Sequence, residues 1–215
     1  MNKSEIVIID YGISNILSVQ QGFERIGASV IVTSNAHVIQ EAKYLVLPGV
    51  GAFRKAMQSL QNLKLLDSIV KAANRGVPLL GICLGMQLLL DESDEFGLTK
   101  GLGLIPGRIE KFPAGKNDFS QTKIPQINWH ELVPSISNKS WKNSLLNNIR
   151  PNDAVYFVHS FVAKPQNKNH ILADYICNGN RISAVIVKDN IIGCQFHPEK
   201  SGKVGLDILK NFILL

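Results

Sequence analysis

The stretch VPLLGICLGMQLLLDES, residues 77–93, joins two apolar runs through one cysteine that stands between glycines. The run that ends at Cys83 has the length of a buried strand, and residues 84–93 predict a helix. A strand that turns directly into a helix at G-x-C-x-G has the shape of the nucleophile elbow that hydrolases build around serine. Such a turn strains the central residue, and its glycine neighbours permit close approach of the backbone.

Two interpretations of Cys83 stay open on this stretch alone. Free cysteine is among the most buried residue types, so Cys83 can be a small core residue. At the start of a helix, however, the helix dipole favours the thiolate, which is the nucleophilic form. The choice depends on whether the rest of the chain supplies a base.

Around this turn, the first half of the chain alternates strand-like and helix-like segments. Strands are predicted at 5–10, 29–34 and 44–49, and helices at 15–26, 52–61 and 63–74. The second half consists of short strand-like runs at 103–113, 123–132, 154–163, 171–178, 181–188 and 190–198. Hairpin turns are predicted at 178–180 and 188–190, and a closing helix at 200–214. We therefore expect one α/β domain over residues 1–215, with a mixed, mostly parallel central sheet, helices on both faces and a β-rich second half.

Composition narrows the class of protein. The chain has 215 residues, of which 45% are hydrophobic and 19% charged, as in ordinary globular proteins. The N-terminus lacks the shape of a signal peptide, and no apolar stretch is long enough to span a bilayer. The cysteines at 83, 177 and 194 form neither a disulfide framework nor a zinc spacing. These features predict a reduced, cytoplasmic protein with no metal or other cofactor and no membrane association.

The net charge of +6 lies entirely in the second half of the chain. Residues 1–100 hold nine basic and nine acidic side chains, whereas residues 101–215 hold fourteen and eight. No basic cluster is interleaved with aromatic residues, so nucleic-acid binding is not expected. The excess of basic side chains in residues 101–215 predicts a solvated basic surface, or a surface that docks an acidic protein partner.

His197 is the best candidate for a base among the five histidines. It lies in QFHPEKSG, where a strand ends and a helix begins, and ligand sites of parallel sheets lie at this edge. Glu199 lies two residues on and can orient the imidazole. Cys83, His197 and Glu199 can thus serve as nucleophile, base and orienting acid. The alternative for His197 is a core residue, which is the commoner place of a lone histidine. The LPGVGAF loop at 47–53 can direct backbone N–H groups at an oxyanion, together with the N–H of Leu84.

Five stretches together resemble the class I, or triad, glutamine amidotransferases. They are DYGISNILSV (10–19), LPGVGAF (47–53), GICLGMQLL (81–89), YFVHSF (156–161) and QFHPEKSG (195–202). Within that class the chain is most similar to the glutaminase-subunit family of imidazole glycerol phosphate synthases, from histidine biosynthesis. The resemblance implies that Cys83 attacks the side-chain amide of glutamine, giving a glutamyl thioester and ammonia. His197 would carry the proton, Glu199 would hold His197, and Gly51 and Leu84 would form the oxyanion hole.

The resemblance also implies a substrate site and a partner. Gln87 and the backbone at His159, Ser160 and Phe161 would hold glutamine. Ammonia would pass to a (β/α)8-barrel cyclase subunit, which makes imidazole glycerol phosphate and AICAR in a heterodimer with this chain. In the family the glutaminase is nearly silent until that partner binds its substrate, and the PGVG loop is implicated in the switch. The residues that match the family's docking face are Asn15, Trp129, Tyr156 and Lys200.

Two stretches depart from the family's pattern. Ser14 stands where a glycine is usual, and Pro-Gln-Ile-Asn-Trp-His at 125–130 shares only its Pro and Trp with the usual Pro-His-Met-Gly-Trp-Asn. The second stretch lines the subunit interface in the family, so the ammonia acceptor stays open. The alternative is a related subunit that supplies ammonia to a barrel partner for amidation of a nucleotide-linked or surface-polysaccharide sugar. One rival class is the cysteine peptidases and chaperones on related folds, in which a histidine often follows the nucleophile directly, whereas Leu84 follows Cys83 here. A second is an inactive binding scaffold, which an intact Cys83, His197 and Glu199 disfavour.

Overall fold

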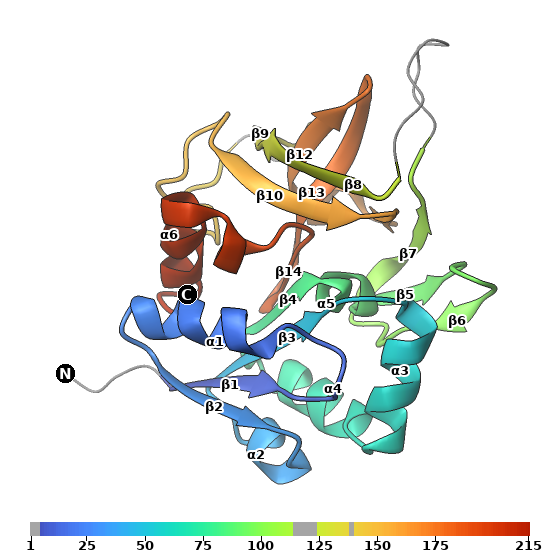
Figure 1. Ribbon diagram of the computed structural model, residues 1–215, viewed down its shortest axis with the longest axis vertical. Helices are drawn as coiled ribbons and strands as arrows, with labels where there is room; N and C mark the ends of the chain where they lie inside the picture. The colour runs from blue at the N-terminus through green and yellow to red at the C-terminus, as the bar shows by residue number, and fades with distance from the viewer. Residues whose placement is uncertain (1–4, 114–123, 138–139) are drawn as a thin grey trace.

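A computed structural model of the protein describes residues 5–113, 124–137 and 140–215 (Figure 1). Its central sheet has eight strands in the order β2-β1-β3-β4-β14-β13-β12-β9. Their bounds in this order are Ser29–Thr33, Glu5–Ile9, Tyr44–Gly49, Leu79–Cys83, Ile191–Cys194, Asn180–Lys188, Ile171–Cys177 and Val133–Pro134. The strands from β2 to β14 pair in parallel and the remaining pairs are antiparallel. The predicted mixed, mostly parallel sheet is confirmed.

Helices cover both faces of this sheet, as predicted. They are α1 (Ile16–Arg25), α2 (Ala36–Gln40), α3 (Phe53–Asn62), α4 (Leu66–Asn74), α5 (Leu84–Leu88) and α6 (Gly202–Phe212), with 3-10 turns η1 (Lys168–His170) and η2 (Pro198–Lys200). Side chains alternate along β1 because successive residues of a strand point to opposite faces. Ile6 and Ile8 pack in the core with α1 and α6, whereas Val7 and Ile9 pack with α2, α3 and α4 (Figure 1).

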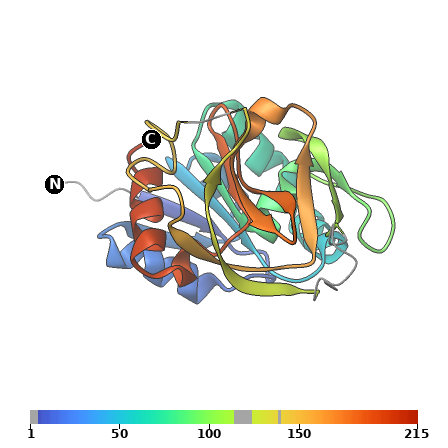
Figure 2. The ribbon, with the colours of Figure 1, turned by 90° about the horizontal axis from the view of Figure 1, so that it is seen from above.

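Two smaller sheets flank the central one. One pairs β8 (Gln126–Glu131) with β10 (Ala154–His159), and Figure 2 shows this pair crossing above the central sheet. The other has the order β11-β7-β5-β6, with bounds Phe161–Pro165, Ile105–Lys111, Leu90–Ser93 and Thr99–Lys100. The run at 154–163 was predicted as one strand, and the structure divides it at Ser160. The residues before the break pair with β8 and those after it pair with β7, so the chain passes from one small sheet to the other at Ser160.

The predicted helix at 84–93 is wrong beyond residue 88. The chain leaves α5 and becomes β5, which pairs with β6 and β7. The leucines around this boundary are completely buried, and a short apolar run suits a helix or a strand equally well, so tertiary pairing decides. The sequence pattern also missed α2. Asn35 caps this helix, because its side chain accepts hydrogen bonds from the N–H groups of His37 and Val38.

The remaining elements agree with the pattern. Both predicted hairpin turns join antiparallel strands, and positive φ angles at Asn178 and Asp189 are typical of such turns. The run predicted at 123–132 is β8, although Lys123 lies outside the described residues. Within the described ranges, no helix combines the length and the apolar character needed to cross a membrane.

Candidate active site

The carboxyl ends of β3, β4 and β14 meet at one edge of the central sheet. Gly49 of β3 lies opposite Cys83 of β4, and Ile82 lies opposite Cys194 of β14. Because the three strands are parallel neighbours, the loop after β3, Cys83 and the segment after β14 are brought together. This edge therefore holds all three parts of the predicted constellation.

Cys83 lies on a strained turn. Its φ of 56° and ψ of −111° are unusual for a residue with a side chain, and such a conformation costs about 1–3 kcal/mol. The flanking glycines make the turn possible. A Cβ on Gly85 would lie 1.7 Å from the carbonyl oxygen of Leu47, and one on Gly81 would lie 2.7 Å from the carbonyl oxygen of Gly85. The structure thus shows the elbow geometry that the glycine spacing predicts.

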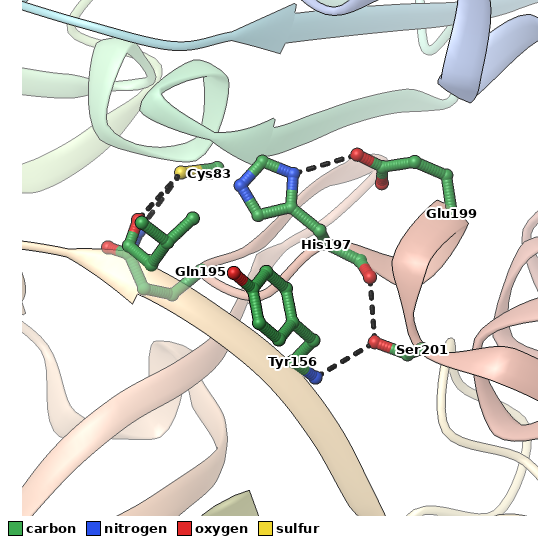
Figure 3. A network of polar contacts seen from close by, with 7 residues as sticks. Cys83, Tyr156, Gln195, His197, Glu199 and Ser201 are labelled. Carbon is green, nitrogen blue, oxygen red and sulfur yellow. Dashed lines mark hydrogen bonds and ion pairs between the residues drawn. The ribbon is translucent and has the colours of Figure 1, made fainter. Parts of the chain in front are cut away.

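His197 and Glu199 form a buried pair beside this turn. Nδ1 of His197 lies 2.7 Å from Oε1 of Glu199, and the side chains are 2% and 1% exposed. Gly22 of α1 packs against this segment, since a Cβ there would lie 2.9 Å from Cδ1 of Leu209 and 3.4 Å from Cβ of Glu199. The other ring nitrogen, Nε2, has no hydrogen-bond partner among the residues that the structure describes. Figure 3 shows this nitrogen pointing toward Cys83.

The charge of His197 follows from these neighbours. Burial alone opposes the charged imidazolium, but the sulfur of Cys83 and the carboxylate of Glu199 outweigh it and raise the pKa of His197. The imidazole therefore holds a proton at neutral pH. A protonated imidazole stabilises a neighbouring thiolate, so the pair is suited to nucleophilic attack.

Replacing Glu199 with glutamine is expected to lower glutamine hydrolysis on the order of 10²- to 10⁴-fold. The amide keeps the size of the side chain but removes the charge that favours imidazolium, so the pKa of His197 should fall. The measurement is the pH dependence of glutamate release. Asp207→Asn is the matched control, because the partner of Asp207 is the exposed Lys203 on α6. Equal activities of the two variants would contradict the role of Glu199.

A pocket of about 370 Å³ opens in front of Cys83. Eight of the predicted site residues line it, namely Gly51, Cys83, Leu84, Gln87, His159, Ser160, Phe161 and His197. Glu199 lies behind His197. Val50, Glu95, Pro125 and Val158 complete the lining.

The side chain of His159 holds the wall of the pocket together. Its Nδ1 lies 2.8 Å from the carbonyl oxygen of Phe161, and its Nε2 lies 2.8 Å from Oη of Tyr175. Because a carbonyl only accepts, Nδ1 carries the hydrogen and Tyr175 donates to Nε2. Burial lowers the pKa of His159 to about 4, so the ring is neutral. Both ring nitrogens are used internally, which leaves the backbone of residues 159–161 for a ligand.

Two further residues at the site were missed by sequence reasoning. Glu95 lines the pocket, and its Oε2 accepts a hydrogen bond of 2.7 Å from the N–H of Phe53 at the start of α3. Tyr11 donates from Oη to the carbonyl oxygen of Pro48 at 2.7 Å and thereby anchors the loop after β3. A Cβ on Gly49 would lie 2.5 Å from that hydroxyl, which explains a glycine there. Glu95 lies in the acidic run at 91–95 and Tyr11 in the DYG stretch, but neither pattern indicates which of its residues reaches the site.

The four predicted docking residues lie on neighbouring elements. Trp129 and Tyr156 face each other across β8 and β10, with ring centroids 6.0 Å apart, and Trp129 is 49% exposed. The carbonyl of Tyr156 accepts from the N–H of His197, which ties this aromatic pair to the site. Asn15 immediately precedes α1, and Lys200 is exposed in η2, which packs against α1.

Comparison with known proteins identifies the class. The sequence profile of the family "Glutamine amidotransferase class-I" matches residues 7–215, so the chain belongs to the class I glutamine amidotransferases. The chain is 48% identical to imidazole glycerol phosphate synthase subunit HisH 1 of Legionella pneumophila (strain Lens), over 98% of this chain and 99% of that protein. It is 45% identical to subunit HisH of Geobacter metallireducens, over 97% of each. The resemblance drawn from the sequence motifs is confirmed.

Solved structures share the fold. PurLQS from Thermotoga maritima aligns with a TM-score of 0.69 at 20% identity, covering 99% of this chain and 98% of that one. A crystal structure of a glutamine amidotransferase aligns with a TM-score of 0.70 at 16% identity, covering 96% of this chain and 98% of that one. At these identities the likeness supports the single α/β architecture.

Proposed function

We propose that this chain is the glutaminase subunit of an imidazole glycerol phosphate synthase, acting in the cytoplasm as one amidotransferase domain over residues 1–215. The observation that carries the proposal is Cys83 on a strained turn, facing an imidazole held by a buried carboxylate, in a pocket of about 370 Å³. The HisH names of relatives that share nearly half of their residues with the chain support the histidine pathway.

The pocket suits glutamine as substrate. The carboxylate of Glu95 offers a negative charge for the α-ammonium group, and the backbone at 159–161 offers hydrogen-bonding groups for the α-carboxylate. The side chain of glutamine would then extend toward Cys83, past Gln87. The N–H groups of Gly51 and Leu84 would stabilise the oxyanion that forms on the amide oxygen.

The first half of the reaction releases ammonia. The thiolate of Cys83 attacks the amide carbon, a C–S bond forms, and the electron pair of the C=O bond moves to oxygen. When the intermediate collapses, the C–N bond breaks and the imidazolium of His197 gives its proton to the departing nitrogen. The products are a glutamyl thioester on Cys83, neutral imidazole and ammonia.

The second half regenerates the enzyme. Neutral His197 takes a proton from water as the water oxygen attacks the thioester carbon. Collapse of this second intermediate breaks the C–S bond and returns a thiolate beside an imidazolium. Glutamate leaves, and Glu199 keeps the ring oriented through both halves.

The ammonia acceptor in this proposal is a (β/α)8-barrel cyclase subunit. Apolar side chains exposed around the site, namely Leu17, Val50, Ile127 and Trp129, offer a surface for such a partner. Sugar amidation, the alternative raised by residues 125–130, is not favoured, because the relatives compared above are named for imidazole glycerol phosphate synthase.

Ammonium salts provide the test of this proposal. The cyclase subunit should make imidazole glycerol phosphate and AICAR from saturating ammonium without this chain, whereas synthesis from glutamine should require it. Glutamate release and product formation are measured with glutamine or ammonium, with and without the cyclase and its ribonucleotide substrate. If the full assembly releases no glutamate, or if the chain is required even with saturating ammonium, the proposal is wrong. If this chain released glutamate with a sugar-modifying barrel subunit but not with the cyclase, the alternative acceptor would be supported.

A further inference from the structure

Gln195 is a buried amide that the mechanism above does not use. It follows β14, lies two residues before His197 and is completely buried. Its Nε2 lies 3.8 Å from Sγ of Cys83, and its Oε1 accepts a hydrogen bond of 3.0 Å from Nε2 of Gln87. Figure 3 shows Gln195 close to the sulfur, and the residue is absent from the lining of the pocket. Its side chain therefore contacts the nucleophile from within the protein.

The neighbours of Gln195 determine which end of its amide faces the sulfur. The carbonyl oxygen of Phe161 lies 3.3 Å from the amide of Gln87, and a carbonyl can only accept, so the NH₂ group of Gln87 lies there. The same NH₂ group faces Gln195, which must therefore present its oxygen to Gln87. The NH₂ group of Gln195 is then left to point at Cys83.

The sulfur thus has both an acceptor and a donor as neighbours. The carbonyl oxygen of Val158 lies 3.7 Å from Sγ and accepts from the neutral thiol. An N–H of Gln195 donates to the same sulfur, and this interaction strengthens when sulfur becomes negative. When the Cys83 thiol loses its proton, the hydrogen bond to Val158 is lost and the hydrogen bond from Gln195 remains.

We propose that Gln195 is a positioning residue, which holds the Cys83 thiolate in place from the protein side and links it to Gln87 on the pocket wall. The proposal deepens the glutaminase mechanism and rests on it. Three other titratable groups interact electrostatically with the sulfur, namely His197, Tyr11 and Cys194, and Glu199 acts on His197. Burial raises the pKa of Tyr11 and that of Cys194, so both stay neutral near pH 7. The charge that favours the thiolate is then the imidazolium, and Gln195 adds a neutral donor.

Alkylation of Cys83 by iodoacetamide, followed by peptide mass across pH, tests this inference on the full chain alone. Gln195→Met removes the donor at similar volume and should raise the pH of half-maximal alkylation by about 0.5–1. Gln195→Glu places a carboxylate next to the sulfur and should raise the pH of half-maximal alkylation further. Gln58→Met, at an exposed position of α3, is the matched control and should leave the curve unchanged. With partner and substrate present, Gln195→Met should lower kcat about tenfold with little change in KM.

Packing alone predicts a different result. If Gln195 merely fills space, the Met variant gives the alkylation curve of the unsubstituted protein, and that result overturns the proposal. Thermal unfolding checks that each variant folds. Should Gln195→Met fail to fold, Gln87→Met releases the amide of Gln195 from its anchor, and the same upward shift is expected. An unchanged curve in that variant would then overturn the proposal. Because alkylation needs neither glutamine nor the cyclase, its outcome is separate from that of the proposed function.

Discussion

Replacing Cys83 with alanine is expected to lower glutamine hydrolysis by on the order of 10⁴-fold or more. The variant loses the sulfur that forms the thioester, while the backbone of the turn is retained. Synthesis from ammonium by the cyclase should be unaffected by the variant, because no step of that reaction uses the sulfur. The measurements are glutamate release and product formation by the assembled pair, with glutamine or ammonium.

Cys194→Ala is the control for this experiment. Cys194 lies in the neighbouring strand β14, is completely buried and does not line the pocket. Its replacement tests whether loss of any core thiol near the site disturbs activity. We expect the Cys194 variant to keep most of its glutaminase activity. If Cys83→Ala retained glutamate release at the level of this control, the thioester mechanism would be wrong.

Gly85→Ala is expected to have the largest effect on folding among the substitutions considered. The added Cβ would lie 1.7 Å from the carbonyl oxygen of Leu47, so β3 or α5 has to shift. Overpacking of this severity should lower the free energy of unfolding by about 3 kcal/mol, and the shift of the turn should displace the N–H of Leu84 and remove activity. Urea unfolding and glutamate release are the two measurements.

Gly76→Ala is the matched control for this substitution. Gly76 has a φ of +86°, and its surroundings leave open space for a Cβ. The variant therefore isolates the cost of a strained backbone, about 1 kcal/mol, from that of a collision. If Gly85→Ala unfolds at the same urea concentration as Gly76→Ala, the close approach of β3 and α5 is not what requires glycine at position 85.

The sequence was sufficient to predict which side chains meet at the sheet edge. Cys83 and His197 each follow an apolar run that reads as a strand, and parallel strands put their carboxyl ends together. Glu199 follows His197 at a spacing of two, which allows direct contact. These inferences rest on local pattern and topology, and the structure brings the three residues together.

Other features depend on tertiary contacts that no local pattern contains. The leucines after Gln87 suit a helix or a strand, and only their pairing with β6 and β7 makes residues 90–93 a strand. The break at Ser160 arises because the chain passes there from pairing with β8 to pairing with β7. Glu95 reaches the pocket from the segment after β5, and Gln195 contacts Cys83 because β14 lies beside β4. Neither contact could be selected from the neighbouring residues in the sequence.

The diazoketone analogue of glutamine, which carries a diazomethyl ketone in place of the side-chain amide, tests the central claim most directly. A thiolate that attacks the side-chain carbonyl group of glutamine should be alkylated irreversibly by this compound. After incubation of the assembled protein, peptide mass spectrometry should find one adduct, on Cys83, formed in proportion to the loss of glutamate release and prevented by excess glutamine. Full modification of Cys83 with glutaminase activity intact, or loss of activity with the adduct on Cys177 or Cys194, would contradict the account.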